Sequence, residues 1–202
     1  PPIHGGSPPP PQDPDKSEPA ALAGAVAEVR EMLATVERPV LLVGAEVHRF
    51  HLQEDVANLI ERVNIPVAST LLGKSVIRED HPLFIGVYGG LIGRDEVQKF
   101  VHESDCLIML GSILTDLEDL DPQSPVMRAG RTVHATADAI TIKHHRYEQV
   151  RFEDFVRGVI AAPMPHFPAR TLPSAETVSP ETPVSADPAT LLGLFSHLER
   201  RL

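Results

Sequence analysis

The sequence predicts an α/β fold: a doubly wound, mostly parallel, Rossmann-like sheet flanked by helices, with proline-rich linkers at both ends. Two short apolar runs, 39–43 and 106–110, support this prediction most strongly. Neither run alternates with polar residues, and a glycine follows each, which is typical of a parallel strand buried on both faces. Amphipathic stretches stand between the strands, and this order predicts a parallel sheet with right-handed crossovers.

The predicted elements begin near Ser17. We expect Ser17 to cap the first helix, because Pro19 stands in the first turn, where the missing N–H of proline costs no hydrogen bond. Over 20–36 apolar residues recur at three- and four-residue steps, as on an amphipathic helix. No element is assigned to the glycine-rich stretch 70–93, whose periodicity is weak. The other expected elements are helices at 53–63, 94–103 and 152–160 and strands at 65–68, 132–135 and 140–142.

Proline divides the chain into a folded part and two tails. Residues 1–16 are dense in proline and predict an extended linker. The folded domain is expected to run over 17–162. Residues 163–188, rich in proline, serine, threonine and glutamate, predict a second linker. Residues 189–202 predict a helix whose apolar face has no local partner, and we expect it to be the first helix of a missing C-terminal domain.

Composition excludes several classes of function. The net charge of −10 argues against a nucleic-acid or anionic-membrane surface. Apolar runs are far shorter than the ~20 residues that a membrane span needs. Cys106 is the single cysteine, so the chain has no internal disulfide and no cysteine zinc site, which fits a cytoplasmic location. Cys106 also begins a buried strand without a basic neighbour, which favours packing over nucleophilic chemistry.

Polar residues follow the first predicted strand. Gly44 is expected to turn the chain there, at positive φ or under the close approach of a helix. Open α/β sheets place ligand crevices at the carboxyl ends of their strands. Glu46, His48 and Arg49 come directly after this end. They either line a crevice or form a solvated loop.

Two glycine patterns resemble phosphate-binding motifs but do not satisfy them. Gly73-Lys74-Ser75 follows a predicted strand, yet a P-loop needs a further glycine five positions earlier, where this chain has Ala68. The chain also reaches Pro82 too soon to form the long helix that follows a P-loop. The glycines of 86–93 lack the G-x-G-x-x-G spacing of a dinucleotide site. A basic turn after a strand is the simpler interpretation.

Histidine pairs and an acidic run raise the question of a metal site. His48 and His51 lie three residues apart, and His144 and His145 are adjacent. Neither pair has a cysteine nearby, and the carboxylates within reach form no recognisable ligand pattern, whereas a zinc site needs three or four ligands that converge. The acidic run 116–121 lacks the spacing and the glycine of a calcium loop, so a solvated loop is the simpler interpretation. No metal ligand is assigned.

Longer stretches carry a resemblance to a known family. They are RPVLLVGA at 38–45, IPVASTLLGK at 65–74, HPLFIGVYGG at 81–90 and ESDCLIMLG at 103–111. Together they resemble the central domain of thiamine-diphosphate-dependent enzymes. Within that superfamily the chain is most similar to the pyruvate and indolepyruvate decarboxylase branch, which acts on 2-oxo acids. The resemblance covers about Ser17 to Ala162.

The resemblance implies a parent enzyme of three α/β domains that uses thiamine diphosphate and Mg²⁺. In the family the activating glutamate belongs to the first domain, and a Gly-Asp-Gly motif of the third holds the metal and the diphosphate. This sequence contains no Gly-Asp-Gly. We therefore expect no catalytic, cofactor-binding or metal-binding residue on this chain. Its expected partners are the N- and C-terminal catalytic domains of the same polypeptide, assembled as a homodimer or homotetramer.

Two alternatives stay open. Acetolactate-synthase relatives bind FAD in this domain and oxalyl-CoA decarboxylase relatives bind ADP, so the chain could be a nucleotide-binding module; it could also be a non-catalytic interaction domain. In fungal pyruvate decarboxylases a cysteine after the first strand is linked to substrate activation, but this chain has Glu46 there. That thiol mechanism does not carry over. Glu46, His48 and Arg49 remain the expected regulatory or interdomain crevice.

Overall fold

Seven strands form the sheet of the structure, a computed structural model that describes residues 16–89, 93–113 and 131–173. Their order across the sheet is β3-β2-β1-β4-β5-β6-β7. The first five strands in this order pair in parallel, whereas β6 and β7 are antiparallel to their neighbours. The strands are β1 (Pro39–Val43), β2 (Val67–Thr70), β3 (Phe84–Tyr88), β4 (Cys106–Leu110), β5 (Thr132–Ala135), β6 (Ile140–Ile142) and β7 (His145–Tyr147).

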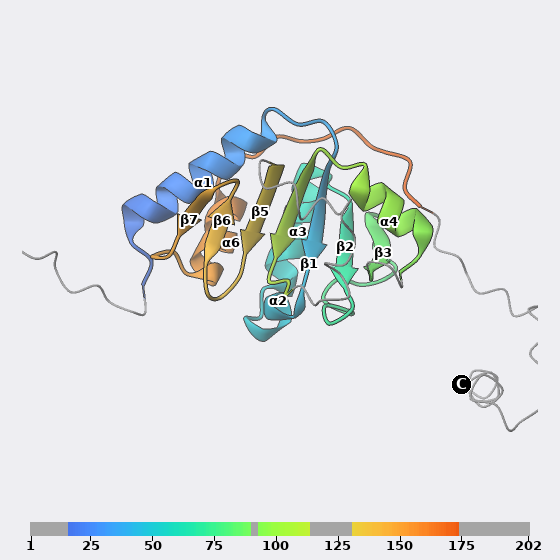
Figure 1. Cartoon of the computed structure of the whole chain (residues 1–202), viewed down its shortest axis with the longest axis horizontal. Helices are drawn as coiled ribbons and strands as arrows, with labels where there is room; N and C mark the ends of the chain where they lie inside the picture. The colour runs from blue at the N-terminus through green and yellow to red at the C-terminus, as the bar shows by residue number, and fades with distance from the viewer. Residues whose placement is uncertain (1–15, 90–92, 114–130, 174–202) are drawn as a thin grey trace, which may run out of the picture.

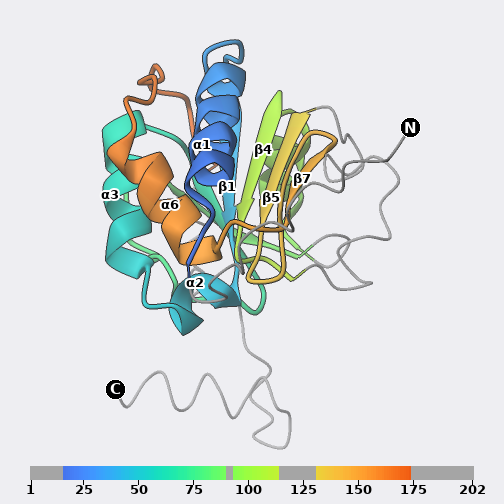
Figure 2. The same cartoon turned by 90° about the vertical axis from the view of Figure 1, so that its left-hand side faces the viewer.

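Helices cover both faces of this sheet, which confirms the expected doubly wound α/β class. Figures 1 and 2 show α1, α3 and α6 together on one face, and α4 lies over β3 on the other. None of the described helices is long and apolar enough to cross a membrane. The helices are α1 (Pro19–Leu33), α2 (Ala45–Arg49), α3 (Gln53–Val63), α4 (Asp95–His102) and α6 (Phe152–Ala161).

The central strand β1 contributes to both cores. Leu41 and Val43 point into the larger core under α1, α3 and α6, and Val40 and Leu42 point into the smaller core under α4. All four side chains are at most 2% exposed. A strand between two helix layers has no solvent-facing side, which explains why this run does not alternate and confirms the prediction.

The first predicted cap is wrong. Glu18, and not Ser17, caps α1, since its carboxylate accepts hydrogen bonds from the amides of Ala20 and Ala21. The Ser17 hydroxyl instead donates to Asp154 (2.7 Å) and accepts from the Arg151 amide (2.8 Å). Ser17 therefore ties the start of α1 to the start of α6, a tertiary contact that local sequence does not reveal.

Two strands and one helix were not expected from the sequence. β3 lies in the glycine-rich stretch, and Gly86 at its centre has a φ of +121°, which interrupts the strand pattern. β7 is polar and partly exposed because it forms an edge of the sheet. The short helix α2 follows β1 directly. β2 begins two residues later than expected, because Val67 is the first residue in the ladder with β1 and β3.

Residues 163–173, which we call the strap, lie in the expected second linker but pack against the domain. The strap crosses the amino edge of the sheet from α6 toward α4 (Figure 1). Phe167 is 5% exposed, and its amide donates to the Val63 carbonyl (2.9 Å). Leu172 packs against the smaller core. Ordered packing therefore extends past 162; the predictions for 1–15 and 174–202 fall outside the described residues.

Candidate regulatory site at the carboxyl edge of the sheet

Gly44 ends β1 against the loop that follows β4. Its φ of −119° is extended, so the expectation of a positive φ is wrong. A Cβ at Gly44 would lie 2.2 Å from the Gly111 carbonyl oxygen and 2.3 Å from the Ser112 Cα. The close approach is that of a neighbouring loop and not of a helix. Gly111 itself has a φ of +63°, and a Cβ there would lie 2.8 Å from both the Glu46 Cβ and the Val47 nitrogen.

Backbone hydrogen bonds join the ends of β1 and β4, where the strand order reverses. The chain runs from β1 to β2 on one side and returns to β4 on the other, so the ends of β1 and β4 form the switch point. The Gly44 amide donates to Leu110 (2.9 Å), and the Glu46 amide donates to Gly111 (3.1 Å). The Val47 amide donates to Gly44 (3.2 Å). These three amides are therefore used within the protein and are not free to hold a phosphate.

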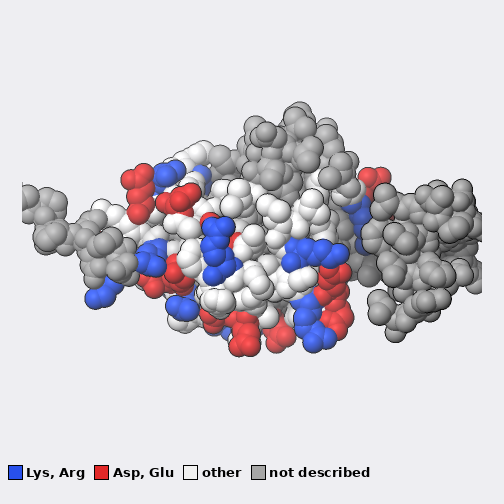
Figure 3. Space-filling model, turned by 90° about the horizontal axis from the view of Figure 1, so that it is seen from below, with Lys and Arg blue, Asp and Glu red and all other residues white. Residues whose placement is uncertain are grey.

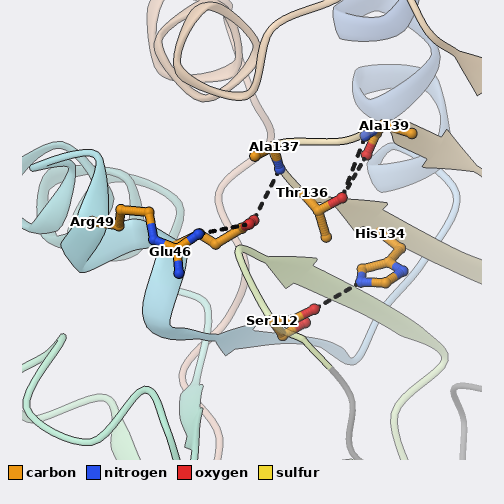
Figure 4. A network of polar contacts seen from close by, with 7 residues as sticks. All are labelled: Glu46, Arg49, Ser112, His134, Thr136, Ala137 and Ala139. Atoms are coloured by element: carbon orange, nitrogen blue, oxygen red, sulfur yellow. Dashed lines mark hydrogen bonds and ion pairs between the residues drawn. The ribbon is translucent and has the colours of Figure 1, made fainter.

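Glu46 lies inside the domain and not at an open crevice. Its side chain is 6% exposed, and its carboxylate accepts a hydrogen bond from the Ala137 amide at 2.9 Å (Figure 4). Arg49, one helical turn later and 63% exposed, approaches the same carboxylate at 3.9 Å. The hydrogen bond between Glu46 and Ala137 connects α2 with the turn between β5 and β6.

His48 points elsewhere. Its Nδ1 accepts a hydrogen bond from the Gln53 side chain (2.6 Å), and the residue is exposed. Of the three residues predicted from the sequence, the structure brings Glu46 and Arg49 together and leaves His48 on the solvent side. Helix α2 directs the three side chains to different sides, and the regulatory or interdomain crevice expected from them stays a prediction.

Sequence reasoning missed the polar residues at the carboxyl ends of β4 and β5. His134 donates from Nε2 to the carbonyl of the fully buried Ser112 (2.9 Å; Figure 4). The Thr136 hydroxyl donates to the Ala139 carbonyl (3.2 Å) and so closes the β5–β6 turn. These residues come at the carboxyl ends of strands that were predicted, and parallel strands bring such ends to one edge. That signal could have found them.

His145 and Cys106 lie in surroundings that serve hydrogen bonding and packing. His145 contacts the Glu28 carboxylate at 2.9 Å, and the Tyr147 hydroxyl donates to the same oxygen. Burial and the neighbouring Asp105 carboxylate raise the pKa of the Cys106 thiol to about 12, which keeps it protonated and unreactive. No group of three or more His, Cys, Asp or Glu side chains in the described ranges could hold a metal ion. The acidic run 116–121 lies outside them.

Charges of both signs intermingle at this edge. Figure 3 views the molecule from the side where β1 ends, and blue and red side chains alternate there. Lys74 of the expected basic turn pairs with Glu79 (3.6 Å), and Arg78 pairs with Asp80 (2.6 Å). This face has no single-sign patch among the described residues that would attract a polyphosphate.

The described residues do not fit the cofactor that the resemblance implies. Thiamine diphosphate requires a carboxylate for its pyrimidine ring and a metal cage for its diphosphate. The buried carboxylate of Glu46 is occupied by the Ala137 amide, and the switch-point amides are bonded to carbonyl oxygens. These residues hold the edge of the domain together, so no chemical step is assigned to them.

Comparison with known proteins identifies the family. The family model described as the thiamine pyrophosphate enzyme central domain matches residues 26–162. The chain belongs to this family. The resemblance read from the sequence is thereby confirmed, and the seven-stranded sheet is the sheet of a central domain.

The relatives include both decarboxylases and a synthase. An indole-3-pyruvate decarboxylase from Azospirillum brasilense is 32% identical over 140 residues, which is 69% of this chain and 26% of that protein. A pyruvate decarboxylase from Candida albicans is 33% identical over 50% of this chain and 18% of its own length. A probable acetolactate synthase large subunit from Methanococcus aeolicus is 34% identical over 55% of this chain and 18% of its own. The chain thus spans about a quarter or less of these relatives.

Proposed function

We propose that this chain is the central, non-catalytic structural and regulatory domain of a 2-oxo-acid decarboxylase that depends on thiamine diphosphate and Mg²⁺. The observation that carries the proposal is the family match over 26–162, together with relatives named as indolepyruvate and pyruvate decarboxylases. The substrate class of the parent enzyme is then the pyruvate and indolepyruvate type.

The geometry of the carboxyl edge supports a non-catalytic role. Catalytic groups need free donors, acceptors or charges directed at a substrate. Here the Glu46 carboxylate, the Gly44 and Glu46 amides and the His134 ring all bond to the domain itself. These groups stabilise the loops after β1, β4 and β5, and we assign them no part in proton transfer.

The regulatory role rests on the position of α2. Arg49 and His48 are exposed on this short helix, while Glu46 anchors it to the β5–β6 turn. A neighbouring domain that contacts Arg49 would therefore be coupled to the sheet through Glu46. We propose the N- and C-terminal catalytic domains of the same polypeptide as these neighbours, in a cytoplasmic homodimer or homotetramer.

A nucleotide-binding module is the second candidate. The relative named as a probable acetolactate synthase large subunit, at 34% identity, favours it. Against it stand the bonded amides of the switch point and the buried Glu46 carboxylate beside them, which would repel a phosphate. Titration of the chain with FAD, ADP and NAD should leave its melting temperature unchanged at millimolar ligand. A shift at micromolar FAD or ADP would place this candidate first.

An activity assay tests the first candidate. The 202-residue chain, supplied with thiamine diphosphate and Mg²⁺, should release no aldehyde from pyruvate, phenylpyruvate or indolepyruvate in an assay coupled to an alcohol dehydrogenase. The full-length parent polypeptide should do so with at least one of these acids. Turnover by the chain alone would contradict the non-catalytic role. Lack of any turnover by the parent would contradict the decarboxylase assignment.

A further inference from the structure

A second polar region lies at the amino edge of the sheet, opposite α2. There an open hollow of about 600 Å³ separates the strap (163–173) from the connection between α1 and β1. Its charged lining residues are Glu37, Arg38 and Arg170, with His166 beside them. This hollow lies apart from the carboxyl-edge residues on which the proposed function rests.

Arg170 is held in place by contacts that do not neutralise it. Its Nη1 donates to the Pro39 carbonyl (3.3 Å), and its guanidinium carbon lies 4.1 Å from the centre of the Phe100 ring. Partial burial, together with the positive charge of Arg38, lowers the pKa of Arg170. The guanidinium is thus oriented in advance, and most of its five donors remain unused by these contacts.

The carboxylates near the two arginines have other partners or lie at the rim. Both oxygens of Asp105 accept hydrogen bonds from backbone amides, those of Glu37 and Arg38, at 2.8 Å each. Glu103 approaches Lys99 at 3.9 Å. Within the described part of the chain, neither Arg38 nor Arg170 has a carboxylate at ion-pair distance.

Apolar side chains form part of the wall of the hollow. Leu33 and Phe167 are buried, Val36 is half-buried, and all three line it. His166 donates from Nδ1 to the Arg62 carbonyl (2.9 Å), which fixes the strap at this point. A ligand that fills such a space needs an apolar body beside its charge.

We propose that this hollow binds a small organic monoanion. Its carboxylate would pair with Arg38 and Arg170, and its apolar body would lie against Leu33, Val36 and Phe167. The nearby charges of Glu37 and Asp105 offset part of the positive charge of the two arginines, so a single negative charge is favoured over the higher charge of phosphate dianion and polyphosphates. A planar carboxylate also matches the fork of a guanidinium, which favours this head group.

Nuclear magnetic resonance on the full 202-residue chain tests the proposal with phenylacetate as the probe. Phenylacetate should shift the Nε–H signals of Arg38 and Arg170 with a dissociation constant on the order of 1 mM, as for a small ligand in an open site. The neutral analogue 2-phenylethanol and inorganic phosphate should shift neither signal at the same concentrations.

Two variants distinguish binding at this hollow from a general effect of positive charge on the protein surface. Arg38→Gln removes an exposed side chain without a carboxylate partner, so the fold should persist while phenylacetate binding weakens about tenfold. Arg30→Gln, which removes an exposed arginine that lines a different hollow between α1 and α6, should leave binding unchanged. Equal binding of 2-phenylethanol, unchanged binding by Arg38→Gln, or no shift with tens of millimolar phenylacetate would overturn the proposal.

Discussion

The two edges of the sheet contrast in how their polar groups are used. At the carboxyl edge, where doubly wound folds commonly bind ligands, the Glu46 carboxylate and the His134 ring bond to backbone groups of neighbouring loops. At the amino edge, Arg38 and Arg170 face an open hollow without a carboxylate partner among the described residues. The carboxyl edge therefore contributes to stability, and the amino edge keeps charge available for a ligand.

The contrast implies that substitutions at the two edges affect different measurements. A change at the carboxyl edge leaves a buried donor or acceptor without its partner, which lowers the free energy of unfolding. A change at the amino edge removes a charge that contacts no carboxylate, which alters binding and leaves stability nearly the same.

Gly44→Ala should have the largest effect. The added Cβ would fall 2.2 Å from the Gly111 oxygen, so the loops after β1 and β4 must separate. We expect a loss of about 3 kcal/mol in the free energy of unfolding, measured with urea. Gly24→Ala is the control: its Cβ would meet only Tyr147 at 3.7 Å, and alanine in α1 should be neutral or stabilising. Equal stability of both variants would mean that the loops after β1 and β4 move apart at little cost in free energy.

Glu46→Ala should come next. It leaves the Ala137 amide without its acceptor and removes the anchor of α2, at a cost of about 2 kcal/mol. Glu46→Gln keeps an acceptor oxygen in place and should cost less than about 1 kcal/mol. Urea unfolding compares the two. If the glutamine variant were as unstable as the alanine variant, the carboxylate charge and not the hydrogen bond would be the important feature.

The contact of Glu28 on α1 with β7 predicts that the stability of the fold depends on pH. Burial alone would raise the pKa of Glu28, but hydrogen bonds with His145 and Tyr147 hold it below its ordinary value of 4.5. A lowered pKa stabilises the folded state above pH 4.5, and this stability is lost as the pH falls through the folded pKa. Tyr147→Phe should cost about 1 kcal/mol at neutral pH and reduce that acid-side loss. Parallel stability curves of the two proteins below pH 5 would contradict the assignment.

Arg38→Gln should have the smallest effect on stability. Its side chain is exposed and has no ion-pair partner in the described ranges, so the free energy of unfolding should change by less than about 0.5 kcal/mol. Urea unfolding of this variant beside Glu46→Ala compares the two edges directly. A loss of similar size in both would remove the distinction between them.

The sequence predicted the central strands and missed features that depend on distant contacts. β1 and β4 were predicted because strands buried on both faces are apolar throughout. β3 was missed because Gly86 adopts a φ of +121° within it. The strap was assigned to a linker from its proline content, since its hydrogen bond to Val63 joins residues far apart in the chain.

The candidate site was predicted in part. Its place at the end of β1 followed from the position of Gly44, but the inward direction of Glu46 depends on the Ala137 amide, 91 residues away. The placement of Arg38 and Arg170 at one hollow likewise has no local signal, because only the folded strap brings Arg170 there.

Calorimetric titration of the 202-residue chain with thiamine diphosphate and Mg²⁺ measures whether this domain can hold the cofactor by itself. We propose that this domain's own hydrogen bonds occupy its carboxyl edge and that the cofactor is held elsewhere in the parent enzyme. The account predicts no heat of binding with the chain and saturable binding with the full-length parent polypeptide. Stoichiometric binding to the chain alone would contradict it.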